Sequence, residues 1–306
     1  MSNYGADISL AELLKSLWTR RWLLAGITVA GSILSLAIVL MLPNVYRAEA
    51  LLAPKQQDEV GGISALAAQY GGLANLAGIN LSEGSADKTA LGLEILVSRQ
   101  FLSEFVRRHD LLVPLMASQG WDRESGELRI DAGKYDPASG TWVRRVRPPK
   151  KTIPSLQEAS ERLRDDVLSV EQDPGTGFVT VSVDHHSPIV AQEWVSQLVR
   201  DLNATVMRQD VEEAEAAIKY LEQQIAATPL ADLQTVFFKL IEEQTKTVML
   251  ARMSAEYLFR TVDPAIVPEM HASPRRVLIV FSSFILSLLA GAVVVLLLDM
   301  RAARAR

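Results

Sequence analysis

Residues that could bind a metal or act as nucleophiles are few in this sequence and widely spaced. The four histidines are His109, His185, His186 and His271, and the chain contains no cysteine. A zinc site needs further ligands that no spacing around the His185-His186 pair supplies. Without cysteine, the chain forms neither disulfides nor thiolate metal sites, and a thiol nucleophile is excluded. We therefore expect structural or solvent-exposed histidines, with no bound metal or cofactor.

Motifs for phosphate binding and hydrolysis are absent from the sequence as well. The glycine-rich stretch 61–78 lacks the Lys-Ser/Thr pair of a P-loop, and the one Gly-Lys pair, Gly133-Lys134, is followed by Tyr135. The sequence also lacks Gly-x-Ser-x-Gly, His-Glu-x-x-His and Asp-x-Asp. The absence of these motifs moves the weight toward a scaffold, so we expect a protein without catalytic activity.

Two uncharged apolar blocks, Trp22–Leu42 and Val277–Leu298, dominate the hydropathy of the chain. At about 1.5 Å per helical residue, each block spans roughly 30 Å, the thickness of the hydrocarbon core of a bilayer. A cleaved signal peptide is the alternative for the first block, because Ala48-Glu49-Ala50 resembles a cleavage site. The block is too long for a signal-peptide core, so we expect two transmembrane helices. The net charge of −5 argues against nucleic-acid binding.

Two spans place both termini on one side of the membrane and the region between them on the other. Basic residues flank the outer and inner ends of the spans almost equally, so charge favours cytoplasmic termini only weakly. In the N-terminal segment, Ser9 and Glu12 have capping-box spacing, and an amphipathic surface helix competes with an extension of the first span. The expected divisions are 1–21 (amphipathic segment), 22–42 (first span), 43–276 (central domain), 277–298 (second span) and 299–306 (tail).

The central domain has the pattern of an α+β fold. The cationic run 144–151 lies in a stretch, 119–151, that is rich in glycine and proline. Its five cations could contact lipid phosphates or an anionic glycan, but charge runs usually face water, so we interpret it as a solvated loop. Ser155 and Ser187 stand where N-caps are expected. The remaining expected elements are a strand at 45–54, helices at 86–109 and 155–166, strands at 167–172 and 177–184 joined by a turn, and a last strand at 257–263.

Two long helices, about 188–228 and 230–256, are expected on either side of Pro229. They form either a helical hairpin or one bent helix protruding from the base. Val211, Ile218 and Ile225 recur every seven residues within a coiled-coil-like apolar seam, which faces either the second helix or a neighbouring subunit. The full seam is Ala204, Met207, Val211, Ala214, Ile218, Leu221 and Ile225.

Three prolines, Pro264, Pro268 and Pro274, lie within eleven positions before the second span. Proline lacks an N–H donor and disfavours helix in the preceding residue, so Pro264 and Pro268 are expected to end the last strand and keep the chain extended. Ser273 and Pro274 are expected to begin the membrane helix as N-cap and first-turn residue. We expect this segment to couple the central domain rigidly to the second span.

Small residues form a stripe on each expected span. Ser283, Ser287 and Gly291 recur every four residues in the second span, and Gly26 and Ala30 do so in the first. Small side chains let helix backbones approach closely in lipid, where van der Waals packing drives association. We therefore expect the two spans to pack along these stripes.

The layout resembles the chain length determinant family, also called Wzz-type polysaccharide co-polymerases. The resemblance is carried by "ISLAELLKSLW", "GLANLAGINLSEGSADKTALGLEILVSRQFL", "LQTVFFKLIEEQTKTVMLA" and "VDPAIVPEMHASPRR". It implies an inner-membrane protein with a periplasmic central domain, assembled as a homo-oligomeric ring or barrel. Such a protein sets the modal length of a surface polysaccharide, such as the O-antigen of lipopolysaccharide, with a separate integral-membrane polymerase and a lipid-linked glycan as partners.

Members of a sister class carry a tyrosine kinase domain after the second span. Only eight residues follow Leu298 here and the sequence has no P-loop, so the kinase-lacking class is expected. The alternative function is a two-span sensor or transport adaptor with a periplasmic ligand domain. A sensor needs a cytoplasmic output module, and neither 21 nor eight residues suffice for an independently folded one.

Overall fold

The computed structural model describes residues 21–55, 84–227 and 231–304. Its contacts divide the chain into two compact units, which we call the span unit (Met1–Val45 with His271–Arg306) and the central unit (Tyr46–Met270). The expected amphipathic segment before the first span and the glycine-rich stretch 61–78 lie outside the described residues.

A four-stranded antiparallel sheet forms the base of the central unit, in the order β6-β7-β1-β8. Its strands are β6 (Leu168–Gln172), β7 (Val179–His185), β1 (Tyr46–Pro54) and β8 (Phe259–Asp263). In β1, side chains alternate between the two faces, so Ala48, Ala50 and Leu52 are buried on one face, opposite valines of β7. The two alanines leave room for a helix to lie close to the central strand.

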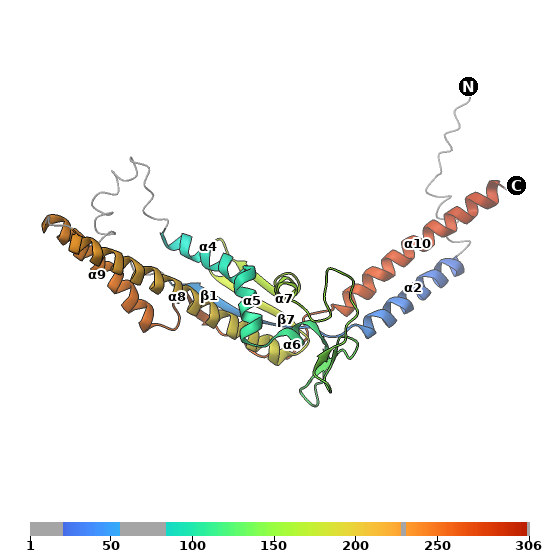
Figure 1. Ribbon diagram of the computed structural model, residues 1–306. Helices are drawn as coiled ribbons and strands as arrows, with labels where there is room; N and C mark the ends of the chain where they lie inside the picture. Colours follow the sequence, from blue (N-terminus) through green and yellow to red (C-terminus); the bar gives the residue numbers. More distant parts are fainter. Residues whose placement is uncertain (1–20, 56–83, 228–230, 305–306) are drawn as a thin grey trace, which may run out of the picture. The chain divides into compact units, whose positions relative to one another are not determined.

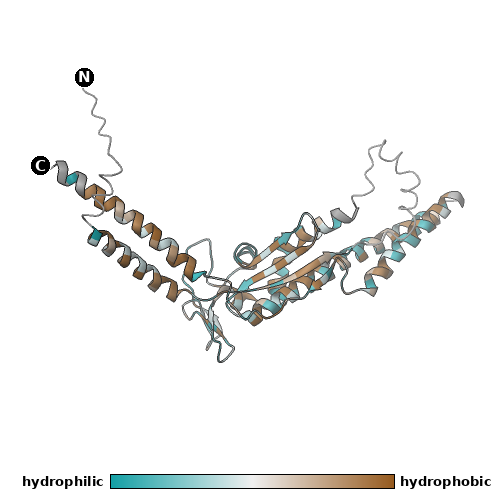
Figure 2. Ribbon diagram, turned by 180° about the vertical axis from the view of Figure 1, so that it is seen from behind, coloured by the Kyte–Doolittle hydropathy of each residue, from teal (hydrophilic) through white to brown (hydrophobic). Residues whose placement is uncertain are grey.

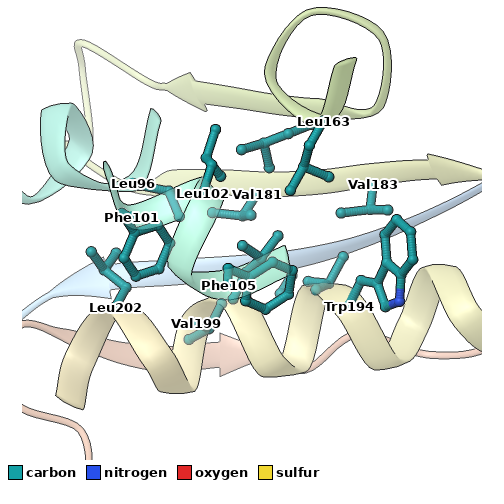
Figure 3. Packing of buried hydrophobic residues seen from close by; sticks show 14 of the residues in the cluster. Leu96, Phe101, Leu102, Phe105, Leu163, Val181, Val183, Trp194, Val199 and Leu202 are labelled. Carbon is teal, nitrogen blue, oxygen red and sulfur yellow. The ribbon is translucent and has the colours of Figure 1, made fainter. Parts of the chain in front are cut away.

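Helices cover the buried face of this sheet (Figure 1). Figure 3 shows Phe105, Trp194 and Val183 among the side chains that meet in this layer, and all three are buried. Full burial of a large apolar side chain contributes about 1.5 to 3 kcal/mol, so this layer is the main source of stability for the central unit. The helices of the central unit are α4 (Gly84–Val97), α5 (Arg99–Arg108), α6 (Leu112–Met116), α7 (Leu156–Arg162), the π-helical turn η1 (Leu163–Val167), α8 (Pro188–Ala227) and α9 (Ala231–Met253), of which α9 packs on α8.

The predicted helix 86–109 is in fact two helices, and the boundary is a cap. Ser98 has an extended backbone, and its hydroxyl accepts a hydrogen bond from Phe101 N at 3.2 Å. This bond satisfies one of the free N–H groups at the start of α5. The break lets α4 and α5 follow different directions while both contribute side chains to the core.

The stretch 119–151, predicted as mostly loop, contains two short hairpins. They are β2 (Ser118–Trp121) with β3 (Leu128–Ile130), and β4 (Tyr135–Asp136) with β5 (Thr141–Trp142). Gly126 and Gly140 adopt positive φ in the two turns, a conformation that favours glycine. Strands of two to four residues carry too little periodicity to be recognised in a sequence.

Local capping signals are confirmed. Ser155 caps α7 by accepting from Glu158 N at 3.1 Å, and Ser187 caps α8 by accepting from Val190 N at 3.4 Å. The turn 173–177 joins β6 to β7 as a hairpin, with Gly177 at positive φ. Each feature depends on neighbours within a few residues, which is why the sequence predicts it.

The span unit consists of α2 (Arg21–Met41) and α10 (Arg276–Arg304), which pack along each other. Both are long and apolar enough to cross a membrane, and only 11% and 6% of their most apolar windows are buried. They are therefore unlike the core helices of a soluble domain. Figure 2 shows hydrophobic residues along most of both helices.

Candidate functional site

The helices α8 and α9 form an antiparallel hairpin, which settles the choice between a hairpin and one bent helix (Figure 1). Near the base, Arg252 of α9 pairs with Glu215 of α8 at 2.8 Å. Near the tip, the Gln234 side chain donates to the carbonyl of Ile225 at 3.4 Å. The hairpin protrudes beyond the sheet because α8 continues after its first turns have packed on β1 and β7.

The predicted seam divides between the base and the hairpin. Met207 and Val211 pack against the core, whereas Ala204 is exposed and does not belong to the buried face. Ala214 is buried, and Ile218 and Ile225 are half-buried in the part of α8 along which α9 returns. The burial of these residues therefore occurs within one chain. A contribution of the seam to contacts between subunits remains a prediction.

The hairpin keeps large apolar side chains on its outer surface. Tyr220 of α8 is 60% exposed, and four residues of α9 are exposed to a similar extent. Side chains of this size usually lie against another surface when they cluster on a protruding element. These four residues of α9 are Val236, Phe238, Met249 and Leu250, and Leu233, Leu240 and Met253 are exposed as well.

The stripe of small residues on α10 faces α2, as expected. The Ser35 hydroxyl donates to the hydroxyl of Ser283 at 2.9 Å. A Cβ atom at Gly31 would collide with the Ser287 side chain, and one at Gly291 would lie 3.6 Å from Ile27. The geometry of this stripe matches close helix packing, although its effect on function is a prediction.

The partner stripe on α2 was predicted on the wrong face. Apart from its chain neighbours and the backbone of its own helix, no described atom lies within 4 Å of a Cβ built at Gly26, and Ala30 is exposed. The contact face follows Ile27, Gly31 and Ser35, which also recur every four residues. Several rows of small residues exist on α2, and only the position of α10 selects among them.

Hydrogen bonds join residues 44–45, which follow α2, to residues 272–276, which lead into α10, and we call this pairing the neck. Val45 N donates to Ser273 O at 2.9 Å, and Ala272 N donates to Val45 O at 2.8 Å. The Arg276 guanidinium donates to the Asn44 side-chain oxygen at 2.8 Å. The segment entering α10 is therefore hydrogen-bonded to the segment leaving α2.

The neck corrects the prediction for the start of the second span. Ser273 forms a β-bridge with Val45 instead of capping a helix, and α10 begins at Arg276, after Pro274. Pairing with Val45 holds the backbone of Ser273 outside the helix. Pro264 directly follows the last residue of β8, as expected, and Pro268 lies in a segment without helix or strand. Rigid coupling by the prolines remains a prediction.

The histidines have structural surroundings. The His185 side chain is buried between α6 and α8, where Nε2 donates to Pro114 O at 3.1 Å and Nδ1 accepts from Ser187 N at 3.1 Å. Burial lowers the pKa of His185 to about 4, so the ring is neutral near pH 7. His109 contacts the Asp201 carboxylate at 3.0 Å, which ties the end of α5 to α8.

Across the described ranges, no group of three or more His, Cys, Asp or Glu side chains is arranged to hold a metal ion. The polar clusters that are present join secondary-structure elements to one another. The arrangement of these polar side chains therefore supports the packing of the elements and the anchoring of one element to another.

Part of the chain matches the model of a known protein family. The model of the Wzz family, described as chain length determinant protein, matches residues 6–109. No curated protein matches the chain. A solved structure described as a full-length bacterial polysaccharide co-polymerase is 14% identical, with a TM-score of 0.39, and the comparison covers 97% of this chain and 99% of that one.

A second solved structure is described as a fragment of WzzB, polysaccharide co-polymerase from Salmonella Typhimurium. It is 12% identical, with a TM-score of 0.30, and the comparison covers 75% of this chain and 100% of that fragment. The matched residues 6–109 include α2, β1, α4 and α5, which are the first span, the central strand and two core helices. Residues 6–109 of the chain are therefore similar to the Wzz-type chain length determinant family.

Proposed function

We propose that the protein is a non-catalytic scaffold of the bacterial inner membrane that regulates the chain length of a surface polysaccharide, the O-antigen of lipopolysaccharide. It acts with a separate integral-membrane polymerase, which elongates a lipid-linked glycan. The observation that carries this proposal is the family match to residues 6–109, which covers the first span and the strand that continues from it.

The proposed topology places both termini in the cytoplasm and residues 43–276 in the periplasm. Two candidate spans of similar length support it, because a second crossing returns the chain to its original side. Reporter fusions after Lys55 and after Arg306 test it. Opposite compartments are expected at the two sites, and the same compartment at both would contradict the topology.

The proposed assembly is a homo-oligomer, in which the α8–α9 hairpins of neighbouring subunits lie against each other. The exposed apolar side chains of the hairpin support this arrangement, since they would be covered in such a ring or barrel. Light scattering of the detergent-solubilised chain measures the assembly directly. A monomer at all concentrations would contradict this part of the proposal.

The function itself is tested by deleting the gene and separating the surface polysaccharide by length. Deletion is expected to change the length distribution while the sugar composition stays the same, because a scaffold alters when elongation stops and leaves the repeat unit unchanged. Complementation with the intact chain restores the distribution. An unchanged distribution, or an altered sugar composition, would refute the proposal.

A further inference from the structure

One end of the central unit is tied closely to the first span by the chain itself. Tyr46, the first residue of β1, follows the last residue of α2, Met41, by five positions. Five residues span at most about 17 Å, whatever the orientation of the central unit. The start of β1 therefore stays within about 17 Å of the end of α2.

The two short hairpins lie at this same end of the central unit (Figure 1). The ring of Trp121 in β2 packs edge-on against Tyr46, with centroids 5.6 Å apart. Asp131 N donates to Ala117 O at 2.8 Å, which links the segment between the hairpins to the start of β2. The β2–β3 hairpin is thus fixed beside the first residue of β1, and the segment that leads on to β4 is hydrogen-bonded to the start of β2.

The cationic run after β5 is an anchored loop. Both terminal nitrogens of the Arg144 guanidinium donate to the Glu158 carboxylate, at 2.8 and 2.7 Å, and the group also donates to the carbonyls of Lys151 and Thr152. These bonds to Arg144 lower the pKa of Glu158, so the pair stays charged at neutral pH. Arg144 therefore serves to hold the loop in shape against α7.

Three other cations of this loop point into solvent, whereas Lys150 pairs with Glu158 at 3.4 Å. Arg145, Arg147 and Lys151 are exposed, and none has a carboxylate partner among the residues that the structure describes. Two branched aliphatic side chains flank them, Val143 at 43% exposed and Ile153 at 63% exposed. We call residues 143–153 the basic loop.

Cations beside exposed aliphatic side chains match the chemistry of a membrane surface. Arginine and lysine pair with lipid phosphates, and apolar side chains enter the boundary between headgroups and acyl chains. A water-soluble anionic glycan would use the cations but would leave Val143 and Ile153 in water. The short connection from Met41 also keeps Tyr46, against which Trp121 of the β2–β3 hairpin packs, within reach of the bilayer, provided that α2 crosses it.

We propose that the basic loop binds the headgroups of anionic phospholipids in the leaflet where α2 ends, with Arg145, Arg147 and Lys151 as the phosphate ligands. The contact would limit tilting of the central unit against the membrane. This function goes beyond control of polysaccharide length, and it depends on α2 as a membrane span.

The chain contains no cysteine, so a single introduced cysteine carries one spin label at a chosen position. We would label Ile153→Cys in the full chain, in nanodiscs with or without phosphatidylglycerol. Thr176→Cys is the matched control, because it is exposed in the turn at the other end of β7 from His185, the partner of Tyr46. Collisions with oxygen and with a soluble nickel complex distinguish a lipid from a water environment.

The label at 153 should gain oxygen contact and lose nickel contact in discs with phosphatidylglycerol, and high salt should reverse the change. The label at 176 should remain in water in every disc. Replacing all three of Arg145, Arg147 and Lys151 by Gln should lower the ratio of bound to free loop roughly 100-fold, because three contacts with phosphates are lost. The same change at Arg200, Arg208 and Lys219, which are exposed on α8, alters net charge equally and should have no effect.

A label at 153 that stays in water in phosphatidylglycerol discs would overturn the proposal. Protection of this label by dextran sulfate in discs without anionic lipid would also overturn it, and would assign the loop to anionic glycans. The proposed function is tested by a different measurement, the length profile of the polysaccharide. Failure of lipid binding by the basic loop can therefore be told apart from failure of the proposed function.

Discussion

Asn203 is a single buried side chain on α8 that holds the start of β8, and its replacement should destabilise the central unit strongly. The side chain is 2% exposed. Its oxygen accepts from Leu258 N at 2.7 Å and Phe259 N at 2.9 Å, while its nitrogen donates to Val199 O at 3.2 Å and Phe259 O at 3.1 Å. All four hydrogen-bonding positions of the carboxamide are therefore used.

The magnitude follows from the groups that are left without partners. Lys55 N donates to Leu258 O, so alternation along the ladder turns the N–H and C=O of Phe259 away from β1, toward Asn203. Asn203→Leu leaves two buried N–H groups unpaired, at about 1 to 3 kcal/mol each. We expect a loss of about 4 kcal/mol, a large part of the 5 to 15 kcal/mol that stabilises typical domains.

Asn203→Asp separates hydrogen bonding from shape. The carboxylate keeps both bonds to N–H groups but faces the carbonyls of Val199 and Phe259, so the folded state favours its protonated form. A raised pKa in the folded state gives stability that is present at low pH and is lost as pH rises above about 4, the pKa of the unfolded chain. This variant should therefore be less stable at pH 8 than at pH 5.

Chemical unfolding of the full chain in detergent, followed by far-ultraviolet circular dichroism, measures these losses. Gln209→Leu, an exposed carboxamide change on the same helix, should alter the free energy of unfolding by less than about 0.5 kcal/mol. A loss below about 1 kcal/mol for Asn203→Leu would refute the assignment of these bonds as a main support of β8.

Three further tests address other parts of the structure. Gly31→Leu should separate α2 from α10 and reduce cross-linking between the spans, because any side chain at 31 meets Ser287, whereas Gly26→Leu should leave cross-linking unchanged. Ile218→Asp should weaken the α8–α9 hairpin and increase proteolysis of α9; unchanged proteolysis and assembly would show that the seam is an ordinary surface. Lowering the pH from about 6.5 to 4 should remove about 3 kcal/mol of stability, because the unfolded chain protonates His185 first. His185→Gln should flatten this pH dependence, and an unchanged slope would exclude His185 as its source.

Features that depend on a few neighbouring residues could be predicted from the sequence, whereas features that depend on distant partners could not. The two candidate spans are visible as uncharged runs because a helix that crosses a bilayer needs about 20 apolar residues. Ser155 and Ser187 cap helices within their own first turn. Asn203 gave no such signal, since its partners lie 55 and 56 residues further along the chain.

The contact between α2 and α10 also combines a feature that the sequence predicts with one that it does not. Gly26 and Gly31 are equally small and both lie in an apolar helix, so composition cannot rank them. Only the position of α10 determines which of the two glycines lies in the contact, and it places Ser287 beside Gly31. The basic run gave a different result, because one of its five cations, Arg144, is an internal anchor whose partner, Glu158, lies 14 residues further along the chain.

The hydrogen bonds of the neck oppose movement of α10 relative to α2. Moving α10 along α2 would break the hydrogen bonds of the Val45–Ser273 pairing and the bond from Arg276 to Asn44, each worth about 0.5 to 1.5 kcal/mol or more. Val45 leads directly into β1, which lies between β7 and β8 in the sheet, so a displacement at the neck reaches a central strand. The other connection, residues 264–272, contains no helix and, apart from the hydrogen bonds of Ala272 at the neck, no described pairing with a strand. If the membrane and the central unit influence each other in control of chain length, β1 is therefore the more direct route, and the proline segment acts as its second attachment.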